Sequence, residues 1–124
     1  MRILVADDDP TQLETICRGL FFCGHHVAPA RSRADAEALL AARGTGAFDL
    51  LLTDITRKDD LGRALVEVAR AIAPSLPILV ITGLTSGPEL AALHAYGAPV
   101  LVKPFRPEEL DAAARAAAAA GRHG

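Results

Sequence analysis

The chain has 124 residues, a length that suits one compact domain and not two. Its residues are 51% hydrophobic but only 4% aromatic, so the core must be built mainly from aliphatic side chains. A formal net charge of −2 provides no overall positive field for nucleic acid, and no apolar run approaches the roughly 20 residues that span a bilayer. We therefore expect a soluble, cytoplasmic protein that binds neither nucleic acid directly nor membrane.

The first predicted strand, residues 1–6, is an apolar run that ends in three aspartates at 7–9. A helix is predicted to begin at Pro10, because the last of these aspartates can cap it and proline suits the first helical position. Gln12 stands at the spacing of a capping box, and Gly24 is expected to end the helix.

A short strand at 26–30 is predicted near a sheet edge, because Pro29 cannot donate a ladder hydrogen bond. Ser32 is the predicted cap of a second helix, which ends at a Gly-Thr-Gly segment. A third apolar strand, 48–53, then leads directly into the single carboxylate of Asp54.

The rest of the chain continues this alternation. The remaining predicted elements are a loop at 56–60, a helix at 61–73, a strand at 78–81, a helix at 88–96, a strand at 99–102 and a helix from Pro107 to Gly121. Five strands alternating with five helices predict an α/β fold, in which helices cover both faces of a parallel sheet through right-handed crossovers.

Four of the five predicted strands run into side chains that can do chemistry. These residues are Asp7 and Asp8, Asp54, Thr82 and Lys103, after the first, third, fourth and fifth strands. Parallel strands end along one edge of the sheet, where ligands bind in open α/β folds, so these side chains should converge on one crevice.

Carboxylates crowded at such an edge repel one another, by roughly 4 kcal/mol for two charges about 4 Å apart at an effective dielectric of about 20. Mg²⁺ relieves this repulsion and prefers oxygen ligands, and Lys103 offers a point charge for phosphate. Taken singly, Asp7 and Asp8 can be solvated loop residues and Lys103 a surface lysine. The combination of acids, hydroxyl and amine is what indicates a site.

With these residues in view, the chain resembles the receiver domains of two-component response regulators over essentially its whole length. The matching motifs are Asp7-Asp8, Asp54, Gly62, Thr82-Gly83 and Lys103-Pro104-Phe105. The resemblance implies a flavodoxin-like (βα)5 fold, a doubly wound parallel sheet of five strands in the order 2-1-3-4-5. It also implies a receiver domain at 1–121 with a C-terminal tail at 122–124.

The resemblance further implies that Asp54 accepts a phosphoryl group from the phosphohistidine of a histidine kinase or phosphotransfer protein. Thr82 and Lys103 would be the other catalytic residues. Such a domain is not an enzyme with separate substrates, because it catalyses only its own Mg²⁺-dependent phosphorylation and dephosphorylation. A downstream protein would bind the face formed by the fourth helix, the fifth strand and the fifth helix.

A Mg²⁺ ion is also implied by the resemblance. Its ligands would be Asp8, Asp54 and the Thr56 carbonyl, and Asp7 would hold it mainly through water. The family's Lys-Pro peptide is usually cis, and proline is where cis peptides occur, but the sequence leaves the isomer of Lys103-Pro104 open.

The sequence departs from the family's usual pattern in three places. Arg57-Lys58 stands where Met-Pro is usual after the acceptor, Val100 stands where an aromatic ring usually changes rotamer, and the apolar Leu84 lies two positions after Thr82. The unusual loop favours an alternative function, a pseudo-receiver that binds proteins without being phosphorylated, whereas the intact Asp54, Asp8 and Lys103 argue against it. A phosphatase-like enzyme is another alternative, but such an enzyme needs a second substrate pocket, for which 124 residues leave little room.

Overall fold

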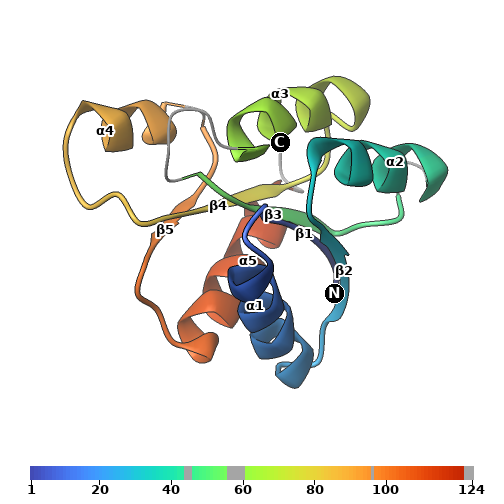
Figure 1. The fold of residues 1–124 in the computed structure, drawn as a ribbon, viewed down its shortest axis with the longest axis horizontal. Helices are drawn as coiled ribbons and strands as arrows, with labels where there is room; N and C mark the ends of the chain where they lie inside the picture. The colour runs from blue at the N-terminus through green and yellow to red at the C-terminus, as the bar shows by residue number, and fades with distance from the viewer. Residues whose placement is uncertain (44–45, 56–60, 96, 122–124) are drawn as a thin grey trace.

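In the computed structural model, which describes residues 1–43, 46–55, 61–95 and 97–121, five parallel strands form one sheet in the order β2-β1-β3-β4-β5 (Figure 1). The strands are β1 (Arg2–Ala6), β2 (His26–Ala30), β3 (Leu50–Asp54), β4 (Ile78–Thr82) and β5 (Val100–Val102). The helices are α1 (Pro10–Phe22), α2 (Arg33–Arg43), α3 (Leu61–Ile72), α4 (Pro88–His94) and α5 (Pro107–Gly121). The predicted flavodoxin-like fold and its strand order are confirmed.

The helices form a layer on each face of the sheet. Helices α1 and α5 lie together on one face, and α2, α3 and α4 lie on the other (Figure 1). Successive side chains of a strand point to opposite faces, so Leu4 of β1 packs toward α2 and α3 whereas Val5 packs toward α1 and α5. Among the described residues, no helix combines the length and the apolar character that crossing a bilayer requires.

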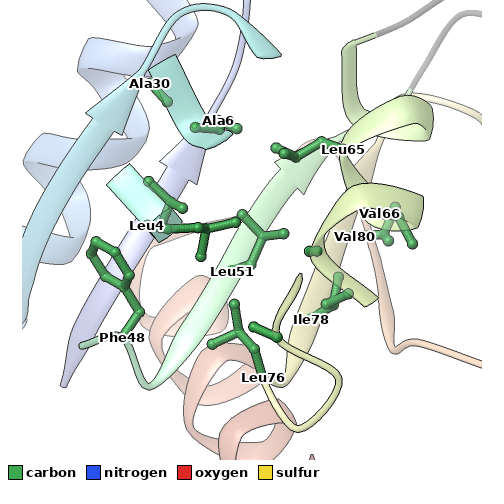
Figure 2. Packing of buried hydrophobic residues seen from close by; sticks show 14 of the residues in the cluster. Leu4, Ala6, Ala30, Phe48, Leu51, Leu65, Val66, Leu76, Ile78 and Val80 are labelled. Carbon is green, nitrogen blue, oxygen red and sulfur yellow. The ribbon is translucent and has the colours of Figure 1, made fainter. Parts of the chain in front are cut away.

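The core is mainly aliphatic on both faces, as the composition predicts. Figure 2 shows Leu4 and Leu51 from the central strands next to each other, in the same cluster as Leu65 of α3 on the α2–α3 face. Every residue of β4 is buried. Because helices cover both faces of the sheet, side chains on both faces of a central strand must be mostly apolar, and its sequence is a nearly continuous apolar run. Strand β2 lies at the sheet edge with Pro29 exposed, as its proline predicts.

Helix α1 begins where its sequence predicts. The Asp9 carboxylate accepts hydrogen bonds from the Thr11 and Gln12 backbone N–H groups, and Pro10 occupies the first turn. The predicted capping box is wrong, however, because the Gln12 side chain turns to the C-terminal edge of the sheet instead of back to Asp9. Gly24, at φ 92°, takes the left-handed conformation that follows the helix.

His25 ties α5 to the N-terminal end of the sheet. Its imidazole is buried, with Nδ1 3.0 Å from the Met1 α-amino group and Nε2 2.5 Å from Asp111 Oδ1. An ammonium group can only donate, so Nδ1 accepts from Met1 and Nε2–H donates to Asp111. This hydrogen bond is the largest cause holding the pKa of the Asp111 carboxyl below its ordinary value. Arg115 acts in the same direction, and partial burial opposes both.

The lowered pKa of Asp111 predicts a pH dependence of stability. Its carboxylate stabilises the fold above the unfolded pKa of about 3.9, and this contribution is lost as the pH falls through the lower folded pKa. We expect Asp111→Asn to lower the free energy of unfolding by about 1 kcal/mol near neutral pH and by much less near pH 2. Urea unfolding at both pH values measures this, with Glu67→Gln as a control for loss of one exposed negative charge. If Asp111→Asn lowers the free energy of unfolding by the same amount at both pH values, the prediction is wrong.

Thr53 is a buried polar residue in an apolar setting. It is 0% exposed, and its partners across the sheet are Ala6 in β1 and Val80 in β4, both part of the apolar cluster facing α2 and α3. Among the residues that the structure describes, its hydroxyl has no hydrogen-bond partner. Such a group costs free energy because its hydration is lost without replacement.

We therefore expect Thr53→Val to raise the free energy of unfolding by about 1 kcal/mol, because valine keeps the shape and removes the unpaired hydroxyl. Thr82→Val is the matched control: Thr82 is equally buried, but its hydroxyl accepts a hydrogen bond from the Leu84 N–H at 3.0 Å. That control should lose about 1 kcal/mol. Chemical unfolding of both variants measures the difference, and equal changes in the two would refute the interpretation.

Candidate functional site

Asp7, Asp54 and Lys103 meet at the C-terminal edge of the sheet. Asp7 follows β1, Asp54 is the last residue of β3, and Lys103 follows β5. The residues two positions earlier in these strands, Val5, Leu52 and Leu101, all pack on the face that carries α1 and α5. Because side chains alternate along a strand, the three site residues are directed to that same face.

The three side chains are joined through Gln12, in the first turn of α1. Lys103 Nζ lies 2.5 Å from Asp54 Oδ2 and 2.7 Å from Gln12 Oε1. Gln12 Nε2 donates to Asp7 Oδ2 and to Asp54 Oδ2. Residues from α1, β3 and the ends of β1 and β5 therefore form one continuous polar network.

Asp7 is the most enclosed carboxylate of the site, with 5% of its surface exposed. Burial raises the pKa of the Asp7 carboxyl, and the negative charges of Asp54 and Asp8 act in the same direction. Hydrogen bonds from the Asp9 backbone N–H, at 2.9 Å, and from Gln12 oppose this rise. The Asp8 residue itself is exposed, so the two adjacent aspartates have different environments.

Thr82 lies beside this network at the end of β4. It is buried, its hydroxyl accepts from Leu84 N–H, and its carbonyl accepts from Lys103 N–H at 2.8 Å. The Lys103-Pro104 peptide, which the sequence left open, is cis. The predicted metal ligand Thr56 lies outside the described residues, as do Arg57 and Lys58.

The donor set fits a small, hard cation. Asp7 and Asp54 both accept from the same amide nitrogen of Gln12, so their oxygens face one position, with the charge of Asp8 nearby. Within the described residues, no three carboxylate, imidazole or thiol side chains are grouped to hold a metal ion by themselves. Two carboxylates completed by water or backbone oxygens match the needs of Mg²⁺, which keeps several waters when bound to proteins.

Gln12 belongs to the site, but the sequence predicted it to be a helix-capping residue. Its spacing after Asp9 matches a capping box, which gave a sufficient local reason for a polar side chain at this position. A second signal was present: Gln12 lies one turn before the buried Ile16 and next to the buried Leu13, so it falls beside the inward-facing stripe of α1. A polar residue beside that stripe, in the turn nearest the strand ends, indicates a polar partner inside.

The enclosure of the Asp54–Lys103 pair predicts a strong energetic coupling. The two side chains are 8% and 27% exposed, whereas those of the Glu14–Arg18 pair on α1 are more than half exposed. A double-mutant cycle of Asp54→Asn and Lys103→Met should give a coupling of about 1–2 kcal/mol in unfolding free energy. The Glu14→Gln and Arg18→Met cycle should give about 0.3–0.5 kcal/mol. Equal couplings in the two cycles would show that the site pair is screened like a surface pair.

The sequence of the chain is similar to those of known response regulators. The family model for the response regulator receiver domain matches residues 3–115. The response regulator MprA of Mycobacterium avium (strain 104) is 37% identical over 117 residues, which are 94% of this chain and 50% of that protein. The swarming motility regulation protein RssB of Serratia marcescens is 33% identical over 111 residues, 89% of this chain and 49% of that protein. The chain thus spans about half the length of these relatives.

Solved structures show the same architecture. The chemotaxis protein CheY4 of Vibrio cholerae superimposes with a TM-score of 0.77 and 28% identity, covering 94% of this chain and 97% of that one. A receiver domain protein from Clostridium thermocellum gives a TM-score of 0.83 with coverage of 98% and 97%, and at 24% identity it supports the fold alone.

Proposed function

Because this chain belongs to the family of response regulator receiver domains, we propose that Asp54 accepts a phosphoryl group from the phosphohistidine of a histidine kinase or a phosphotransfer protein. The observation that carries the proposal is the contact of Asp54 with Lys103 at the end of the central strand, 2.5 Å from Nζ to Oδ2. It places a potential nucleophile and a cationic group for phosphate in one half-buried position.

The transfer would use this chain's own residues as follows. A carboxylate oxygen of Asp54 attacks phosphorus, and the phosphorus–nitrogen bond of the phosphohistidine breaks. The bonding electrons remain on the imidazole nitrogen of the partner. The Lys103 ammonium stabilises the negative phosphoryl oxygens, and the Thr82 hydroxyl, on the neighbouring strand, binds one of them after transfer.

Asp8, Asp54 and the Thr56 carbonyl would hold Mg²⁺, with Asp7 acting mainly through water. When bound, the ion would supply positive charge that offsets both the carboxylates and the phosphoryl oxygens. The two facing carboxylates of Asp7 and Asp54, and the nearby charge of Asp8, support this assignment.

The proposed receiver unit is residues 1–121, and it would catalyse only its own phosphorylation and dephosphorylation. Its output surface would be the face of α4, β5 and α5. On α4, Leu93 is fully buried and Leu90 packs against the core, so their place in the fold is structural, whereas His94 is exposed. Val100 of β5 is also packed against the core cluster, and Tyr96 lies outside the described residues.

We expect the purified chain to take up one phosphoryl group from a small-molecule phosphodonor in the presence of Mg²⁺, and Asp54→Asn to take up none. Intact-protein mass spectrometry measures this directly. Asp49→Asn is the matched control, because Asp49 precedes the N-terminal end of the same strand and is remote from the site. Labelling of the Asp54 variant at the parent level would overturn the proposal, and repeated turnover of the donor that persists in Asp54→Asn would indicate an enzyme instead.

A further inference from the structure

Gln12 makes contacts that the proposed reaction would require other groups to make. Its Nε2 donates to oxygens of Asp7 and Asp54, which are the atoms facing the proposed cation position. Its Oε1 accepts from Lys103 Nζ at 2.7 Å, as an oxygen of a transferred phosphoryl group would. One side-chain amide thus presents a donor to the carboxylates and an acceptor to the ammonium group.

Asp54 Oδ2 is the atom most affected by this arrangement. It accepts from Gln12 Nε2 and lies 2.5 Å from Lys103 Nζ, so two donors are directed at one oxygen. Hydrogen bonds to a charged oxygen are stronger than those between neutral groups. The bonds from Gln12 and from Lys103 therefore each lower the electron density that this oxygen can offer for attack on phosphorus. The amide also occupies the space between Asp54 and Asp7, which a cation held by Asp54 and linked to Asp7 through water would need.

We propose that the Gln12 side chain is a competitive occupant of the site, which must leave before a divalent cation and a phosphoryl group can bind at Asp54. This inference rests on the proposed function and identifies a residue that sets how readily the site is loaded. The first turn of α1 is held by the Asp9 cap, so departure requires only rotation of the Gln12 side chain. Gln12 as a whole is half-buried, so its side chain borders solvent into which it can rotate.

The proposal predicts a change in cation affinity when the amide is removed. Gln12→Met keeps the length of the side chain and removes both donor and acceptor. Without the competing amide, Mg²⁺ should bind about tenfold more tightly, the effect expected for a lost hydrogen bond to a charged group. The thermal midpoint without divalent ions should fall, because Asp7 and Asp54 then face each other without the bridging donor.

Calorimetric titration with Mg²⁺ alone, beside thermal unfolding, tests this prediction. Thr15→Ala is the matched control, since Thr15 lies one turn further along α1, is exposed and donates only to the Thr11 carbonyl in the described contacts. Parent-like Mg²⁺ affinity in Gln12→Met, or weaker binding, would overturn the proposal. Parent-like affinity in Thr15→Ala together with tighter binding in Gln12→Met would support it.

The composition of the chain offers a direct probe of the amide itself. Gln12 is the one glutamine in the sequence and there is no asparagine, so its NH₂ group gives the one carboxamide signal pair in a ¹⁵N–¹H spectrum. We expect this pair to move to the position of a solvated amide as Mg²⁺ saturates the parent protein. Signals that stay unchanged at saturation would show that Gln12 remains in place and would overturn the inference.

The outcomes also separate this inference from the proposed function. A parent chain that binds Mg²⁺ and is labelled at Asp54, while Gln12→Met behaves identically, overturns only the role of Gln12. A parent chain and a Gln12→Met variant that both fail to bind Mg²⁺ and to take up phosphate overturn the proposed function, and the role of Gln12 with it.

Discussion

The close approach of Asp7 and Asp54 is the constraint around which the C-terminal edge of the sheet is built. Two carboxylates in a largely enclosed position repel each other more strongly than they would in water, and the raised pKa of Asp7 reflects its burial together with the neighbouring charges. Lys103 supplies the compensating positive charge and Gln12 supplies a shared donor. An arrangement that is costly for folding is suited to binding a cation, which brings further positive charge to the two carboxylates.

The rigidity of that arrangement comes from elements that do no chemistry. Strands β1 and β3 are adjacent and buried on both faces, so Asp7 and Asp54 are positioned by two closely packed central strands. At the opposite end of the sheet, His25 links the start of β1 to α5 through Met1 and Asp111. The α1–α5 layer that covers the site face is thereby fixed at both ends, since the Asp9 cap holds α1 close to Asp7.

Membership of the receiver family accounts for the strand-end residues but not for Gln12, which is argued from this chain alone. The relatives MprA and RssB are about twice as long as the chain, so the activities of those whole proteins belong to more than the receiver unit. Within that unit, a side chain that competes for the acceptor would tune how readily phosphorylation occurs without altering the chemistry of the acceptor.

The sequence by itself determined the succession of elements and which strand-end residues meet at one edge of the sheet. Short apolar runs and helical periodicity predict the alternation, and parallel strands must bring Asp7, Asp54 and Lys103 to one edge. Only the tertiary structure decided that Asp7 is buried while Asp8 is exposed, that Leu93 faces inward, and that Lys103-Pro104 is cis. It also decided that the Gln12 side chain contacts Asp7, Asp54 and Lys103 instead of capping its own helix, and Lys103 is 91 positions away in the sequence. Periodicity reports which residues share a face, but the direction of a polar side chain depends on the groups that packing places opposite it, and those come from distant segments.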